Sequence, residues 1–292
     1  MTAKIINGNE LAKEIRKKIS EEVIQLKKKY TITPVITTVI VGNDSSSMLY
    51  LKLRDNACKE VGILSKHNEF DATISEQIIF QTIHKLNVDD SVHGILIQYP
   101  VPKHFSQEKL IQVIDQRKDV EGFNPINLGR TLIGDEYLVP CTPLSVLTIL
   151  EHENIALKGK DIVIINHSNV VGKPLAALLL NRNATVTICH VFTRNLKQYT
   201  SKADILITGA GVPNLITTDH IKDDVIVLDV GIVETKEGVR GDVDFDAVKE
   251  KAAMLTPVPG GVGPVTIACA LKNMIKTYRN CIDNFYNKSS IL

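Results

Sequence analysis

Side chains that could take part in acid–base chemistry or bind a polar ligand occur at three points in the first half of the sequence. Tyr50 and Arg54 are four residues apart in an expected helix and would share one of its faces. Gln98 ends an apolar stretch, GILIQ, and Pro100 stops strand pairing two residues later. Glu121 lies in a turn-rich loop, RKDVEGFNP. An amide at the carboxyl end of a strand is well placed for a ligand. Tyr50 alone would equally suit a core, and Glu121 would equally suit solvent.

A second candidate site lies in KDIVIINHSNVVGKPLAALLL, where an apolar strand, a short loop and a helix are expected in succession. Ser168 and Gly172 are small, and Pro174 suits an early helical position. Such a loop presents backbone N–H groups and a helix N-terminus to phosphate. The pattern G-x-G-x-x-G is absent, because Asn166 stands where its first glycine would be, so an ordinary strand-to-helix turn fits equally well.

The next expected strand, ATVTICH, ends at His190 and leads into VFTR. A site for NAD usually offers Asp or Glu here to the ribose hydroxyls, and neither occurs. Arg194 and His167 are candidate ligands for the 2′-phosphate of NADP, although each would equally suit a solvated loop.

Apolar runs that alternate with helical periods must position these residues. A helix is expected from Leu11 to Leu26 and another over 46–61. Strands are expected in PVITTVIVG, GILSKHNEF, SVHGILIQ, KDIVIIN, ATVTICH, ADILITGAG and VIVLDVG. Most are short and continuously apolar, which is typical of parallel sheets covered on both faces. The sequence therefore predicts an α/β fold built from right-handed βαβ units.

Prolines in LVPCTPLS, residues 138–145, indicate a domain boundary. We expect a first domain over 1–140, a parallel-sheet domain over 141–263, and a C-terminal helix over 264–292 that packs back on the first domain. Residues 256–266, TPVPGGVGPVT, hold three prolines and three glycines, so their middle can be neither helix nor strand interior. This loop would lie at the crossing between the domains, and clefts there favour small ligands.

Composition excludes several classes of function. The 292 residues carry a net charge of +1 with no long run of one sign, which argues against nucleic-acid and membrane-surface partners. No apolar run is long enough to span a membrane, and the N-terminus lacks the apolar core of a signal peptide. The five cysteines are dispersed without a CxxC pair, which argues against a metal site or disulfide framework. A cytoplasmic enzyme is expected.

Taken together, YLKLR, GILIQYPVP, KDVEGFNPINLGR, PCTP, SNVVGKP and TPVPGGVGPVT resemble the methylenetetrahydrofolate dehydrogenase/methenyltetrahydrofolate cyclohydrolase family, the bifunctional FolD type. The resemblance runs from about residue 4 to residue 280. It implies a folate-binding catalytic domain, a Rossmann-type domain that binds NADP or NAD, and a homodimer. The implied reactions oxidise 5,10-methylenetetrahydrofolate and hydrolyse the methenyl product to 10-formyltetrahydrofolate, in one-carbon metabolism and purine biosynthesis.

The resemblance also implies roles for single residues. Tyr50 would pack on the pterin ring, Gln98 would orient the catalytic group at position 54, and Glu121 would bind the pterin. Further substrate-binding positions are Pro100, Gly260, Gly261 and Pro264. The cofactor-binding positions are Asn166, His167, Ser168, Val171, Gly172, Pro174, His190, Val191, Arg194, Gly211, Gly231 and Ile232.

This sequence departs from the family pattern at functional positions. Arg54 replaces a lysine, and arginine, with a pKa above ~12, does not release its proton. We therefore expect slow hydrolysis, while hydride transfer, which depends on positioning, survives. Glu121 replaces an aspartate and adds a methylene to it. Asn166 replaces a glycine of the phosphate loop, which would weaken cofactor binding.

His167 and Val191 remove a permanent cation and a hydroxyl from the expected 2′-phosphate site, so the choice between NADP and NAD stays open. Two alternatives to the slow hydrolase also stay open. In one, the chain is fully bifunctional and Arg54 acts through its charge and hydrogen bonds. In the other, the chain has lost catalysis and serves as a folate- or nucleotide-binding protein or as a dimer partner.

Overall fold

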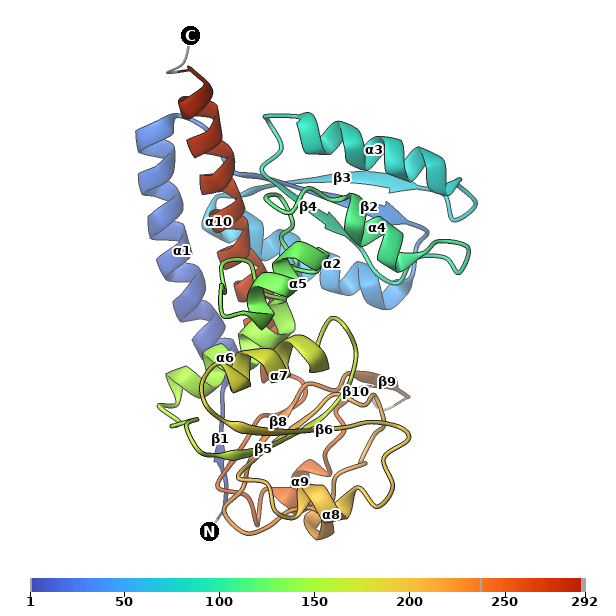
Figure 1. Cartoon of the computed structure of the whole chain (residues 1–292), viewed down its shortest axis with the longest axis vertical. Helices are drawn as coiled ribbons and strands as arrows, with labels where there is room; N and C mark the ends of the chain where they lie inside the picture. The colour runs from blue at the N-terminus through green and yellow to red at the C-terminus, as the bar shows by residue number, and fades with distance from the viewer. Residues whose placement is uncertain (1, 237, 290–292) are drawn as a thin grey trace. The chain divides into compact units, whose positions relative to one another are not determined.

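The computed structural model describes residues 2–236 and 238–289 (Figure 1). The chain divides into two compact units, each built from separated segments. Unit 1 comprises Met1–Ala12, Thr131–Asp135 and Pro140–Thr266. Unit 2 comprises Lys13–Arg130, Glu136–Val139 and Ile267–Leu292. Two long helices, α1 (Gly8–Tyr30) and α10 (Val262–Ser289), therefore contribute residues to both units.

Unit 1 contains a six-stranded sheet in the order β1-β11-β8-β7-β5-β6, and every pair in it is parallel. Its strands are β1 (Lys4–Ile5), β5 (Asp161–Ile165), β6 (Thr185–Cys189), β7 (Ile205–Thr208), β8 (Ile226–Asp229) and β11 (Met254–Leu255). The chain runs from β5 outward to β6 and then returns past β5 to β7. This reversal of strand order is the point at which open α/β sheets bind ligands.

Helices cover both faces of this sheet (Figure 1). On one face lie α6 (Cys141–His152) and α7 (Gly172–Leu180), and on the other lie α8 (Lys197–Thr200) and α9 (Phe245–Val248). The remaining elements of unit 1 are η1 (Thr218–His220) and an antiparallel pair, β9 (Val233–Thr235) and β10 (Gly238–Arg240). All four residues of β7 are buried, as the continuous apolar runs predict for a covered parallel sheet.

Unit 2 contains a three-stranded parallel sheet in the order β3-β2-β4. Its strands are β2 (Val35–Val41), β3 (Leu64–Phe70) and β4 (Gly94–Ile97). The side chains of β2 are buried along its whole length, because helices cover both faces. Val39 and Val41 form a core with α3 (Glu76–Val88) and α4 (Gln107–Val113). The opposite face carries α2 (Ser45–Val61), and α5 (Pro125–Leu132) follows later in the chain.

Within unit 2, α1 and α10 lie side by side (Figure 1). Arg279 of α10 forms an ion pair with Glu22 of α1, with 2.7 Å between Nη2 and Oε1. The hydroxyl of Tyr278 donates to the carbonyl of Ile32 at 3.0 Å. From Ile267 onward α10 therefore completes the core of unit 2.

The C-terminal helix begins at Val262, two residues before its expected start, and so includes Pro264. Proline is tolerated in a first turn, because N–H groups there have no partner within the helix. The expected end of this helix at residues 290–292 lies outside the described residues. The helix expected over 46–61 forms as α2.

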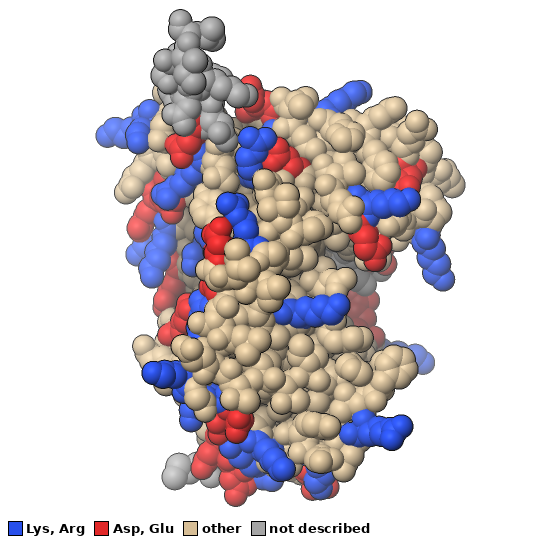
Figure 2. Space-filling model, viewed as in Figure 1, with Lys and Arg blue, Asp and Glu red and all other residues tan. Residues whose placement is uncertain are grey.

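Charged side chains of both signs are interspersed on the face drawn in Figure 2. Among the residues that the structure describes, no helix is long and apolar enough to cross a membrane.

Candidate active site

In unit 2, the candidate side chains gather around the ends of β2 and β4. These strands are direct neighbours, and the N–H of Gln98 donates to the carbonyl of Val39 at 2.9 Å. Gln98 is 7% exposed, and its Nε2 donates to the carbonyl of Tyr99 at 3.3 Å. Among the described residues, its Oε1 has no hydrogen-bond partner. The amide therefore lies at the carboxyl end of a strand, as expected, with an acceptor oxygen left for a ligand.

Arg54 is fully buried against this sheet. Its Nη2 donates to Oγ1 of Thr38, in the middle of β2, at 2.7 Å. Within the described chain, its Nε and Nη1 have no partner, and the buried hydroxyl of Thr37 has none either. Unpaired buried donors on a cation cost free energy, so the site favours a ligand that offers these donors an acceptor.

Tyr50 lies on α2 one helical turn before Arg54 and is half-buried. The same helix exposes Leu49 and Leu53. This end of α2 offers apolar surface to a flat ring, with the cation one turn further along. Pro100 is exposed beyond the end of β4.

Glu121 follows a segment that is tied to the sheet by backbone pairing. A parallel bridge joins Asp119 to Ile95 of β4. The buried carboxylate of Asp119 accepts hydrogen bonds from the N–H groups of Gly122 and Asn124, at 3.0 and 2.8 Å. The backbone on both sides of Glu121 is therefore fixed before any ligand binds.

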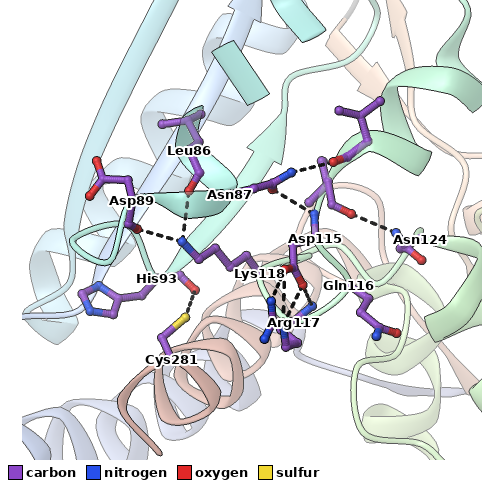
Figure 3. Close-up of polar contacts among 12 residues, drawn as sticks. Leu86, Asn87, Asp89, His93, Asp115, Gln116, Arg117, Lys118, Asn124 and Cys281 are labelled. Carbon is purple, nitrogen blue, oxygen red and sulfur yellow. Dashed lines mark hydrogen bonds and ion pairs between the residues drawn. The ribbon is translucent and has the colours of Figure 1, made fainter. Parts of the chain in front are cut away.

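Lys118 anchors the other end of this segment to α3 (Figure 3). Its ammonium donates to the carbonyls of Leu86 and Asp89, at 3.0 and 2.8 Å. Asn87 of the same helix accepts from the N–H of Asp115 at 2.9 Å (Figure 3). Carbonyls at the C-terminal end of a helix favour a cation, so Lys118 is a structural anchor.

Burial gives Glu121 an unusual protonation state. It raises the pKa of the carboxyl to about 8, with the charge of Arg54 acting against the rise and that of Asp119 adding to it. The described chain forms no ion pair between Arg54 and Glu121, although the charge of Arg54 lowers the pKa of Glu121. A carboxyl that titrates near neutral pH can both accept and donate a proton. The site therefore holds a titratable acid beside a permanent cation.

Tyr99 was not singled out from the sequence, yet it lines a small cavity of about 10 Å³ together with Glu121 and Asp119. Burial raises the pKa of its phenol, and the charge of Glu121 raises it further. Its buried hydroxyl has no partner. The sequence signal was weak, because an aromatic residue between Gln98 and Pro100 equally suits a core.

In unit 1, the expected cofactor-binding residues converge on one edge of the sheet. Each group follows the carboxyl end of one of four adjacent parallel strands, in the spatial order β6, β5, β7, β8. Asn166, His167, Ser168, Val171, Gly172 and Pro174 follow β5; His190, Val191 and Arg194 follow β6; Gly211 follows β7; Gly231 and Ile232 follow β8.

Asn166 organises the loop between β5 and α7. Its Oδ1 accepts from the N–H groups of Ser168 and Gly172 at 2.8 and 3.1 Å, and its Nδ2 donates to the carbonyl of Gly209 at 2.7 Å. A Cβ on Gly172 would lie 1.9 Å from the Asn166 carbonyl oxygen, so only glycine fits there. The Asn166 side chain therefore braces its own loop and connects it to the loop after β7.

This bracing determines which N–H groups remain for phosphate. Ser168 Oγ accepts from the N–H of Val171 at 3.1 Å, so the side chains of the loop occupy several donors at the start of α7. In the part of the chain that the structure describes, the N–H groups of Asn169 and Val170 have no partner. These two donors fit a phosphate at the loop tip.

Two imidazoles from neighbouring loops contact each other beside this tip. The ring centroids of His167 and His190 are 4.8 Å apart. Nδ1 of His190 accepts from the N–H of Phe192 at 3.2 Å, which leaves Nε2 to carry the proton. Arg194 and Val191 are exposed. Residues 190–194 include His190 and Arg194 and no Asp or Glu, which fits a 2′-phosphate better than a free ribose.

The middle of the proline–glycine segment, residues 258–261, is a turn rather than a helix or strand, as predicted, whereas residues 262–266 begin α10. Gly260 has φ +101°, and a Cβ on Gly261 would lie 2.5 Å from the Pro257 carbonyl oxygen. A Cβ on Gly8 would lie 1.7 Å from the Gly261 carbonyl oxygen, so α1 begins tightly against this loop. Nothing lies within 4 Å of a Cβ on Gly263. The loop belongs to unit 1, and the role of Gly260, Gly261 and Pro264 in substrate binding stays a prediction.

These features define an α/β protein of two units. Unit 1, with its six-stranded parallel sheet, has the architecture of dinucleotide-dependent oxidoreductases. Two family models match the chain: the tetrahydrofolate dehydrogenase/cyclohydrolase catalytic domain over residues 6–121, and the NAD(P)-binding domain of the same name over residues 140–282. The chain belongs to the tetrahydrofolate dehydrogenase/cyclohydrolase family.

Individual relatives agree over almost the full length. The bifunctional protein FolD of Methanosarcina barkeri is 49% identical over 273 residues, which cover 94% of this chain and 95% of that protein. The crystal structure of FolD from Campylobacter jejuni is 43% identical with a TM-score of 0.93, over 95% of this chain and 99% of that one. The crystal structure of FolD from Trypanosoma brucei, solved with NADP and an inhibitor, is 32% identical with a TM-score of 0.92. The match covers 97% of this chain and 99% of that one.

Proposed function

We propose that the chain oxidises 5,10-methylenetetrahydrofolate to the methenyl compound with NADP and hydrolyses that product to 10-formyltetrahydrofolate. The observation that carries this function is the set of buried polar atoms without partners in unit 2, from Arg54, Gln98 and Thr37, in a chain of this family. Buried polar atoms normally have a hydrogen-bond partner, and a bound ligand that forms these hydrogen bonds explains atoms that lack one in the protein. The comparisons give no support to a member that has lost catalysis.

On the folate side, each residue has a distinct task. Tyr50 supplies a ring face for the pterin, and Gln98 Oε1 accepts a hydrogen bond beside it. Glu121 binds ring N–H groups from a backbone fixed by Asp119. Arg54, held by Thr38, supplies a fixed positive charge and two free donor atoms toward the one-carbon unit.

The loop after β5 fits a dinucleotide phosphate, because the N–H groups of Asn169 and Val170 are unpaired within the described chain, and Gly172 lets the start of α7 pack against the Asn166 backbone. His167 and Arg194 supply the basic groups for a 2′-phosphate, which supports NADP over NAD. When bound, the cofactor supplies the hydride acceptor. The chain's own contribution to this step is to hold the nucleotide in place.

Hydrolysis proceeds more slowly than oxidation in this proposal. Arg54 holds its proton, so it cannot relay one between water and the folate. Glu121 is the neighbouring group whose pKa, about 8, lies near working pH, and it takes over part of the proton transfer.

We also propose a homodimer that acts in the cytoplasm. β6 is an edge strand of the unit 1 sheet and exposes Ile188, so a second copy of β6 can pair with it. Sedimentation of the wild-type chain and of Ile188→Lys tests this pairing: a dimer that the substitution converts to monomer supports it. The five cysteines form no disulfide within the described chain, which suits a reducing compartment.

The enzymatic assignment is tested by incubating the purified chain with 5,10-methylenetetrahydrofolate and either NADP or NAD. We expect reduced nucleotide to appear with NADP, in an amount equal to methenyl- plus 10-formyltetrahydrofolate. A folded chain that produces no reduced nucleotide with either cofactor would contradict the proposal.

A further inference from the structure

Two buried carboxylates lie beneath the loops at the carboxyl edge of the unit 1 sheet. Asp229 is the last residue of β8 and is 3% exposed, and Asp242, shortly after β10, is fully buried. Neither forms an ion pair in the part of the chain that the structure describes; both are held by O–H and N–H donors. Burying a carboxylate without a cation costs free energy, and here the hydrogen bonds from the chain offset that cost.

The carboxylate of Asp242 holds the loop that follows β7. Its Oδ2 accepts from the hydroxyl of Thr208, the last residue of β7, at 2.7 Å, and from the N–H of Ala210 at 2.5 Å. Its Oδ1 accepts from the N–H of Val212 at 2.9 Å. Three donors within five residues therefore converge on one side chain that is 30 positions further along the chain.

The loop that follows β8 packs against the same carboxylate. A Cβ on Gly231 would lie 2.3 Å from Asp242 Oδ1, so the backbone of Gly231 rests on it. Asp229 fixes this loop from its other side, because its Oδ1 accepts from the N–H of Gly231 and its Oδ2 from that of Val243, both at 2.9 Å. Residues 209–212 and 229–231 are thus braced by one pair of carboxylates.

Strand order indicates which half of a dinucleotide lies over these loops. In an open α/β sheet the dinucleotide crosses the point where strand order reverses, with its pyrophosphate at the first strand-to-helix turn. Here that turn follows β5, and the basic residues His190 and Arg194 follow β6 on one side. The nicotinamide half must then extend to the other side, over the ends of β7 and β8.

We propose that Asp242 is a positioning residue for the nicotinamide half of the bound dinucleotide. It does not touch the cofactor, because it is fully buried and both of its oxygens are occupied by the chain. It holds residues 209–212 and 229–231 in one arrangement, so that these loops need no ordering when the nicotinamide binds. This inference rests on the proposed use of a nicotinamide dinucleotide.

The test compares Asp242→Asn with the wild-type chain. Asparagine has nearly the same shape but offers one acceptor oxygen and an NH₂ group to three donors, so the loops lose their common anchor. Thr208→Val removes only one donor and serves as a milder variant. Asp246→Asn is the matched control, because Asp246 is exposed on α9 and bonds only Lys249.

Two ligands separate positioning from a general loss of structure. NADP reports on the whole site, whereas adenosine 2′,5′-bisphosphate carries only the adenine half. We expect Asp242→Asn to raise the Kd for NADP by about 10- to 100-fold. Thr208→Val should raise it by about 2- to 10-fold. The Kd for adenosine 2′,5′-bisphosphate should stay within about twofold in both variants.

An equal rise in the Kd of both ligands, in Asp242→Asn and in Thr208→Val, would overturn the inference. An unchanged Kd for NADP in both variants would also overturn it. If Asp242→Asn does not fold, Thr208→Val decides the test. A Kd that rises for NADP and not for adenosine 2′,5′-bisphosphate supports the inference, and an equal rise for both ligands overturns it. A wild-type chain that binds neither ligand would instead overturn the proposed cofactor, and the inference with it.

Discussion

The buried guanidinium of Arg54 donates from Nη2 to the hydroxyl of Thr38 at 2.7 Å, which fixes a permanent cation against the middle of β2. Its Nε and Nη1 are left without partners. The cation therefore has one anchor in the protein and two donors for a ligand. This arrangement favours holding and polarising a substrate over transferring a proton to or from it.

Replacing Arg54 with lysine should raise the rate of methenyltetrahydrofolate hydrolysis. Lysine can lose its proton when it is desolvated, and positioned acid–base help is typically worth ~10²–10⁴-fold. The shorter side chain also leaves a gap, so we expect a gain of about 10-fold or more. The decay of methenyl absorbance measures it. Lys52→Arg, two residues away at an exposed position of α2, is the control, and a folded Arg54→Lys chain with no gain would refute this explanation.

The stability of the chain should depend on the ionisation of Glu121. Burial raises the pKa of this carboxyl from 4.5 to about 8, so the folded state favours the protonated form. That contribution is complete below about pH 4.5 and disappears as the pH rises through 8. The unfolding free energy of the wild type should therefore fall, relative to Glu121→Gln, by up to about 5 kcal/mol over this range.

Urea unfolding at a series of pH values measures this difference. Glu14→Gln, an exposed site on α1, controls for a general change in charge. Parallel curves for the wild type and Glu121→Gln would show that Glu121 ionises as it does in water.

Removing the side chain of Asn166 should weaken cofactor binding. Asn166→Ala deletes the acceptor for the N–H groups of Ser168 and Gly172 and the donor to Gly209. Leaving these partners unpaired should cost about 1–3 kcal/mol of stability. We expect a lower Tm and a Kd for NADP raised by about 10-fold. Gln198→Ala, on the surface of α8, is the control; tighter binding by Asn166→Ala would show that the loop needs a bare backbone.

Arg194 should distinguish NADP from NAD. If its guanidinium binds the 2′-phosphate, Arg194→Ala removes a charge-assisted hydrogen bond worth about 1.5–3 kcal/mol. The Kd for NADP should rise about 10-fold or more while that for NAD stays nearly constant. Lys197→Ala removes another exposed cation nearby and should affect neither. An equal effect of Arg194→Ala on both nucleotides would place the 2′-phosphate elsewhere.

Much of the fold was predictable, because the apolar runs that form β5 and β7 are short and continuous, and a buried parallel sheet requires such runs. The start of α10 lies two residues before the expected one, because a first turn tolerates Pro264. The candidate site was predictable where chemistry and strand ends coincide, as at Gln98.

The residues that were missed act through contacts between distant segments. Thr38 and Thr37 are the polar residues of a strand that otherwise consists of valine and isoleucine, and only the packing of α2 shows that the Thr38 hydroxyl meets Arg54. The sequence predicts weaker cofactor binding from Asn166, because pattern comparison registers the lost glycine and not the hydrogen bonds that its side chain makes. Asp242 sits 30 residues beyond the loop it braces, so no local pattern connects them.

The most direct test of the account follows methenyltetrahydrofolate, 10-formyltetrahydrofolate and NADPH together after the chain is mixed with 5,10-methylenetetrahydrofolate and NADP. We predict that NADPH and the methenyl compound rise together, and that the methenyl compound then decays slowly to 10-formyltetrahydrofolate, faster in Arg54→Lys. The absence of both NADPH and methenyl product from a folded chain would contradict the enzymatic function. Methenyl product that never accumulates, with 10-formyltetrahydrofolate formed as fast as NADPH, would show that Arg54 does not slow hydrolysis.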